Sequence, residues 1–111
     1  MTLSQWQAEV ARFVDAHELE TSETARMLDI VSEVGELAKE ILQGSDYGAG
    51  SVALKATWPL EMGDTLFALI CLANITEVSL KQALAQAMAK YRARLEATGE
   101  AGSESVARGD E

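Results

Sequence analysis

The sequence predicts an all-α protein, and three observations support this class. Apolar residues recur with helical spacing along most of the chain, and alternating runs of β-branched residues are missing. The chain has a single proline, and its glycines cluster mainly within residues 44–50 and 99–109. At 111 residues, 48% of them hydrophobic, it is long enough to bury a core. We therefore expect one helical domain over residues 1–97 and a disordered tail over residues 98–111.

The first two helices are predicted from an apolar stripe and from start and stop signals. Helix one should start after Ser4, because Ser4 and Gln7 have the spacing of a capping box, and should run to about His17. After a polar link, the second helix is expected over about 22–43 and should stop at Gly44. The segment 44–51 that follows is rich in glycine and is predicted to be a mobile loop, and a lid role is one hypothesis for it.

The third and fourth helices cover the rest of the predicted domain. The third spans about 52–76, and Pro59 requires either a kink or a start of the main helix near Trp58, which we favour. The fourth should begin at Ser79, which has capping-box spacing to Gln82, and end near Ala97. Its inward face is predicted to comprise Leu84, Ala87, Met88, Tyr91 and Leu95.

The charge and the cysteine content argue against several classes of function. Eighteen acidic and nine basic residues give a net charge of −9, which disfavours nucleic-acid and anionic-membrane partners. The longest apolar run, 66–73, is far below the roughly 20 residues of a membrane span, and the N-terminus shows no signal-peptide pattern. The single cysteine, Cys71, is expected to be a buried thiol. These features predict a cytoplasmic protein.

Acidic residues line one face of the second predicted helix. At 100° per residue, four of them fall within an arc of roughly 60°, namely Asp29, Glu33, Glu36 and Glu40. Glu61 and Asp64 form a second pair at the base of the third helix, which is apolar nearly all round and should be surrounded by other helices. Because burying unpaired carboxylates costs several kcal/mol, a shared cation would let them converge, although a solvated acidic face is the alternative. Oxygen donors favour Mg²⁺, with Mn²⁺ as a second option.

The two acidic pairs resemble the signature of a known family. Glu33-Val-Gly-Glu36, 24 further residues, and Glu61-Met-Gly-Asp64 look like the ExxE and ExxD motifs of the MazG-like all-α nucleoside triphosphate pyrophosphohydrolases. The likeness covers about Met27 to Leu95. It implies a four-helix-type bundle completed by homo-oligomerisation, and the apolar third helix also favours a homodimer or homotetramer.

The resemblance implies a hydrolase that cleaves a nucleoside or deoxynucleoside triphosphate to the monophosphate and pyrophosphate, a nucleotide-pool house-cleaning reaction, with Mg²⁺. Carried over residue by residue, Glu33, Glu36, Glu61 and Asp64 would be the catalytic metal ligands. Either Glu33 or Glu36 would also orient or deprotonate the attacking water. Glu40 is an accessory acid or simply exposed.

Four further residues are candidates for substrate binding, each with a structural alternative. Lys90 and Arg94 could clamp phosphate oxygens or form a solvated basic face. Asn74 is either a substrate contact or, as we favour, a hydrogen-bond partner of a neighbouring helix. Trp6 could stack on a nucleobase, although its stripe position favours the core.

Some features depart from the family pattern, and another class of function remains open. The Arg-rich or Trp-containing ending of some relatives is missing after Arg94, so the base preference cannot be carried over. By contrast, Gly35 and Gly63, one inside each acidic pair, suit the family pattern and suggest that a helix or phosphate approaches closely. The alternative function is a noncatalytic helical dimerisation or regulatory module whose acidic cluster binds a metal.

Overall fold

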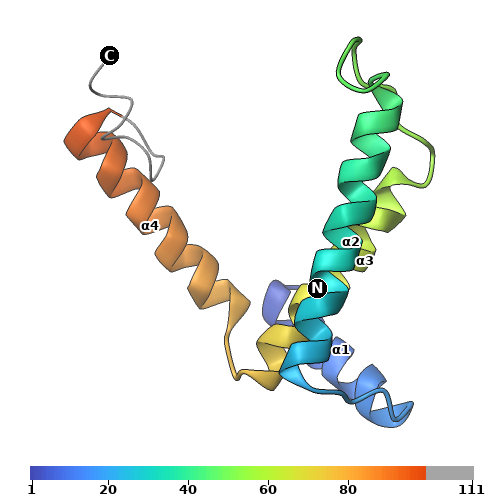
Figure 1. Ribbon diagram of the computed structural model, residues 1–111. Helices are drawn as coiled ribbons and strands as arrows, with labels where there is room; N and C mark the ends of the chain where they lie inside the picture. Colours follow the sequence, from blue (N-terminus) through green and yellow to red (C-terminus); the bar gives the residue numbers. More distant parts are fainter. Residues whose placement is uncertain (100–111) are drawn as a thin grey trace. The chain divides into compact units, whose positions relative to one another are not determined.

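The computed structural model describes residues 1–99 and shows four helices and no strand within them (Figure 1). The helices are α1 Leu3–Ala16, α2 Glu23–Gly44, α3 Trp58–Ile75 and α4 Leu80–Thr98. The predicted all-α class is therefore confirmed. The chain divides into two compact units, Met1–Val78 and the segment that starts at Ser79, and each is described here by itself. Of the predicted tail, Thr98 closes α4 and residues 100–111 lie outside the described part of the chain.

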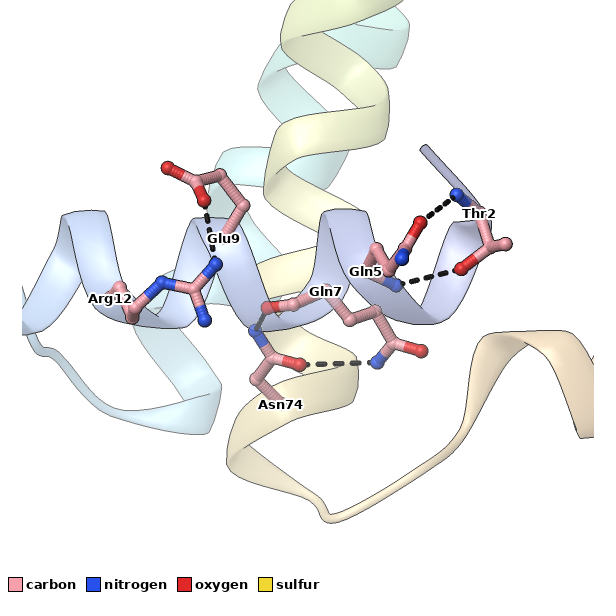
Figure 2. A network of polar contacts seen from close by, with 6 residues as sticks. All are labelled: Thr2, Gln5, Gln7, Glu9, Arg12 and Asn74. Carbon is pink, nitrogen blue, oxygen red and sulfur yellow. Dashed lines mark hydrogen bonds and ion pairs between the residues drawn. The ribbon is translucent and has the colours of Figure 1, made fainter.

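The N-cap residue of α1 is not the one that the sequence predicted. Thr2, rather than Ser4, is the N-cap, and it forms a reciprocal capping box with Gln5 (Figure 2). The Thr2 hydroxyl accepts from Gln5 N at 3.1 Å, and Gln5 Oε1 accepts from Thr2 N at 2.7 Å. Both pairs have the right sequence spacing, but the side chain of Gln7 is engaged elsewhere, with Asn74 and Val78. The predicted Ser4–Gln7 box is thus wrong.

In the first unit, α2 and α3 lie side by side as an antiparallel hairpin, and α1 packs on α3 as well (Figure 1). Ser22 caps α2, and α3 begins at Trp58 with Pro59 in its first turn, as the sequence predicted. Within residues 1–99, the buried apolar side chains come mostly from α3, namely Ala68, Ile70, Cys71 and Ala73. Leu60, Leu66 and Leu69 of the same helix stay exposed, so α3 is covered on only part of its surface.

The segment between α2 and α3 is a series of hydrogen-bonded turns. Ser45 is buried, and its hydroxyl accepts from Gly48 N at 3.1 Å while its carbonyl accepts from Gly50 N at 2.9 Å. Gly44 is the last residue of α2 rather than the residue after it. A side chain could not replace its hydrogen, because a Cβ would overlap the carbonyl oxygen of Ala53. The lid role stays a prediction.

The fourth helix has the predicted ends. The Ser79 hydroxyl accepts from Gln82 N at 3.3 Å, and Gly99 ends the helix with a left-handed φ of 77°. However, no residue of α4 is buried, and Leu84, Met88, Tyr91 and Leu95 of its predicted inward face are exposed. Within its own unit, as described to residue 99, nothing covers this face, so its inward packing stays a prediction.

Within residues 1–99, no single helix is long and apolar enough to cross a membrane. Only α3 and α4 taken together, as a bent pair, pass a test of length and composition.

Candidate metal site

The acidic line of α2 lies on the side that faces α3. Arg26, Glu33 and Glu40 are spaced by seven residues, so their side chains leave the helix in nearly the same direction. At one end of this line Arg26 lines a cavity together with Cys71 of α3. At the other end Glu40 accepts a hydrogen bond from the backbone of Lys55, three residues before α3 begins. Glu33, midway between them, therefore lies on the same side.

The two predicted acidic pairs lie at a similar level of the hairpin. Glu36 precedes Glu40 by one turn, or about 6 Å along the axis. Glu61 follows Trp58, the first residue of α3, by three residues, or about 4.5 Å. The two helices run antiparallel from the same connection (Figure 1). These spacings along the two axes therefore place Glu33 and Glu36 at about the level of Glu61 and Asp64.

The four carboxylates differ in burial. Glu33 and Glu61 are half-buried, whereas Glu36 and Asp64 are exposed. Oε2 of Glu61 is shielded from solvent and has no hydrogen-bond partner among residues 1–99. A buried carboxylate oxygen without a donor is unfavourable, and a divalent cation is one group that would satisfy it. The all-oxygen donor set thus fits Mg²⁺ or Mn²⁺, and the four residues are those that would hold it.

The single chain does not hold these residues as a closed metal cage. Among residues 1–99, no three side chains of His, Cys, Asp or Glu are grouped closely enough to hold an ion. Helices α2 and α3 thus place the two acidic pairs at one level, but the carboxylates of the pairs do not converge. The metal ligands proposed from the sequence stay a prediction.

Asp29, the first acid of the line, has a different role. Its carboxylate lies 3.5 Å from Nη1 of Arg26, whose side chain is only 11% exposed. Nη2 of Arg26 donates to the carbonyl of Leu19 at 2.7 Å, while its Nε is buried without an acceptor. Sequence analysis missed this buried guanidinium, although its position seven residues before Glu33 was a usable signal.

Cys71 is buried, as predicted, and lies in the same cavity as Arg26. Burial raises the pKa of its thiol, an effect that the nearby Arg26 guanidinium partly offsets. Cys71 is therefore a protonated, inert thiol near neutral pH.

Asn74 joins α3 to α1. Its Nδ2 donates to the main-chain carbonyl of Gln7 at 3.0 Å, and its Oδ1 accepts from Gln7 Nε2 at 3.1 Å (Figure 2). Gln7 Nε2 also donates to the carbonyl of Val78 at 2.9 Å, which fixes the end of α3. These contacts support the structural interpretation of Asn74 that the sequence favoured.

The other substrate-binding candidates lie on α1 and α4. Trp6 is 49% exposed and borders an apolar groove between α1 and α3 that also includes Val10 and Gly63. On α4, the ammonium of Lys90 lies 4.7 Å from the ring centre of Tyr91, and the guanidinium of Arg94 lies 6.0 Å from it. Nη1 of Arg94 is buried and finds no hydrogen-bond partner in the part of the chain that the structure describes. Both cations are therefore gathered around one aromatic ring, and a donor of Arg94 is unused.

Gly35 and Gly63 do not mark a close approach within this chain. A Cβ built on either residue meets no atom within 4 Å. Among the residues described in the first unit, close helix packing is therefore not the reason for these glycines. The approach of a phosphate or of another helix stays a prediction.

Comparisons with known proteins were made on the sequence and on the fold. Residues 20–98 match the family model of the MazG nucleotide pyrophosphohydrolase domain. The chain is 36% identical over 99 residues to the uncharacterized protein YpjD of Bacillus subtilis, a match covering 84% of this chain and 86% of that protein. The crystal structure of B. subtilis YpjD superposes with a TM-score of 0.70 at 36% identity and covers 85% of this chain and 96% of its own. A Bacillus-conserved MazG protein, a nucleotide pyrophosphohydrolase, gives a TM-score of 0.68 at 32% identity, covering 82% and 89%.

Proposed function

Because this chain belongs to the MazG nucleotide pyrophosphohydrolase family, we propose that it hydrolyses a nucleoside or deoxynucleoside triphosphate to the monophosphate and pyrophosphate in a Mg²⁺-dependent reaction. The observation that carries the proposal is the pair of acidic motifs at one level of the α2–α3 hairpin, with a buried, unpartnered oxygen on Glu61. Such an oxygen needs a positive partner, and the triphosphate substrate needs one too, because its charges repel an acidic site.

Glu33, Glu36, Glu61 and Asp64 would hold the ion, with Mn²⁺ as a substitute for Mg²⁺. When bound, the ion would offset phosphate charge and acidify a water molecule. Glu33 or Glu36 would also orient or deprotonate the attacking water. Lys90 and Arg94 contact phosphate oxygens, a role supported by the unused Nη1 of Arg94.

The proposal includes a homodimer or homotetramer. Large apolar side chains stay exposed on all four helices within residues 1–99, among them Phe13 of α1, Leu28 and Val31 of α2, Leu60 of α3, and Leu84 and Leu95 of α4. Exposed apolar patches of this extent are typical of protein interfaces. A second copy would cover them and bring additional side chains towards the half-buried acids. The partners proposed are thus the nucleotide and further copies of the chain, with no nucleic acid and no membrane. The cytoplasmic location also stays a prediction.

The test is a panel of standard and damaged nucleoside triphosphates, incubated with and without Mg²⁺ and followed by identification of the products. We expect monophosphate and pyrophosphate from at least one substrate, only with the metal. Glu36→Gln should lower the rate of this hydrolysis at least about 100-fold, because it removes a charged ligand and keeps the shape of the side chain. Its circular dichroism spectrum should match that of the wild type. Diphosphate and phosphate as products would refute the reaction class.

The alternative is a noncatalytic helical module with a metal-binding acidic cluster. The uncovered apolar face of α4 is the observation that favours it, because such a face is also suited to docking. It predicts Mg²⁺ or Mn²⁺ binding without product release from any triphosphate. The same panel therefore separates the two functions.

A further inference from the structure

Glu40 is a buried carboxylate that the proposed reaction does not use. Only 5% of the residue is exposed, and neither of the ion pairs found among residues 1–99 involves it. Its Oε1 accepts a hydrogen bond of 3.1 Å from the backbone N of Lys55, 15 residues further along the chain. A carboxylate is costly to bury, so this hydrogen bond is a specific feature of the fold and not an incidental surface contact.

The hydrogen bond of Glu40 leads directly into the first turn of α3. The carbonyl of Lys55 accepts from the N of Trp58 at 3.0 Å, and Trp58 is the first residue of α3. The carbonyl of Thr57 in turn accepts from the N of Glu61 at 3.1 Å. One short path of backbone and hydrogen bonds therefore connects Glu40 on α2 to Glu61 on α3.

A second contact holds the same segment against the end of α2. The N of Ala53 donates to the carbonyl of Gly44 at 2.9 Å, and the backbone of Ala53 lies against the Cα of Gly44, which leaves no room for a side chain. Gly44 and Glu40 are one turn apart on α2, while Ala53 and Lys55 are two residues apart in a segment that is neither helix nor strand. The segment 53–55 is thus attached to α2 at two points before α3 begins.

We propose that Glu40 is a positioning residue, whose carboxylate fixes the start of α3 on α2 and so sets Glu61 and Asp64 level with Glu33 and Glu36. The purpose of this positioning, the alignment of the four proposed metal ligands, rests on the proposed function. The contact between Glu40 and Lys55 can be tested without that function. Glu40 is not a metal ligand in this proposal, because its Oε1 is already committed to Lys55.

The experiment compares Glu40→Ala and Glu40→Gln with the wild-type full-length chain by two measurements. The first is the hydrogen exchange rate of the Lys55 and Trp58 amides, and the second is the affinity for Mn²⁺, measured by electron paramagnetic resonance. Glutamine keeps an oxygen acceptor for the Lys55 amide but has no charge, so it should keep slow exchange and near wild-type Mn²⁺ affinity. Alanine should speed exchange at both amides at least tenfold and weaken Mn²⁺ binding by about 10- to 100-fold.

Glu36→Gln is the matched control, since it should weaken Mn²⁺ binding and leave exchange at Lys55 and Trp58 unchanged. If Glu40→Gln weakens Mn²⁺ binding as much as Glu40→Ala, Glu40 is a ligand and the positioning role is wrong. If exchange at Lys55 is unchanged in Glu40→Ala, the carboxylate does not hold the segment, and the inference also fails. If the wild-type chain binds no Mn²⁺, the proposed function and the purpose assigned to the positioning fail together, while exchange at Lys55 still decides separately whether Glu40 holds α3.

Discussion

Replacing Asn74 with alanine should weaken the joint between α1 and α3 by about 2 kcal/mol. Two hydrogen bonds are lost, those of 3.0 and 3.1 Å between Asn74 and Gln7, and each contributes about 1 kcal/mol net. The loss should not be much larger, because Gln7 Nε2 keeps its bond to the Val78 carbonyl and the Gln7 carbonyl has a second lone pair for its helical bond.

The assay is urea unfolding followed by circular dichroism at one fixed protein concentration. Asn74→Asp keeps the acceptor for Gln7 Nε2 but places a charged oxygen against the Gln7 carbonyl, so it should cost at least as much as alanine. A double-mutant cycle with Gln7→Ala should show a coupling of about 1 kcal/mol, because alanine at position 7 removes only the side-chain bond. An Asn74→Ala variant that unfolds at the wild-type urea midpoint, but has a raised KM for a triphosphate, would show that Asn74 is a substrate contact instead.

Two further predictions concern a helix end and a buried thiol. Gly44→Ala should lower the free energy of unfolding by about 1–3 kcal/mol because its Cβ meets the Ala53 carbonyl. Gly35→Ala, whose Cβ lies in open space, should keep or raise stability by up to about 1 kcal/mol, and equal thermal midpoints for the two variants would contradict this reasoning. Burial raises the pKa of Cys71 above the value of 9.0 for a free thiol, so the folded state favours the protonated form. The stability that this thiol contributes is therefore complete below pH 9.0 and is lost as the pH rises through the raised pKa. Urea midpoints between pH 7 and 10 should therefore fall more for the wild type than for Cys71→Ala, and parallel profiles would exclude this effect.

Local signals were sufficient to predict the helices. Ser79 caps its helix as expected, α2 begins one residue after the predicted start at Ser22, and Pro59 lies in the first turn of α3, because these features depend on a few adjacent residues. The exception is the start of α1. The sequence favoured Ser4 as the cap, whereas Thr2 holds that position and Gln7 contacts Asn74 and Val78, about 70 residues away.

For the candidate site, the sequence predicted which acids share a helix face but not what each of them contacts. Asp29, Glu33 and Glu40 fall on one line by helical geometry alone. Yet Asp29 pairs with the buried Arg26, Glu40 binds the Lys55 backbone, and only Glu33 is left half-buried towards α3. Roles of this kind depend on groups that are distant in sequence, so periodicity cannot assign them.

The sequence alone therefore determined the helical class, the family and the order of the acidic motifs, since these depend on residue types and on spacings within single helices. Tertiary structure decided that Asn74 ties α1 to α3, that Glu40 is buried at the start of α3 and that Glu61 has an unpartnered oxygen. The physical reason is that burial and hydrogen bonding are properties of surfaces brought together by folding, and a carboxylate has no distinct role until its neighbours from other helices are in place.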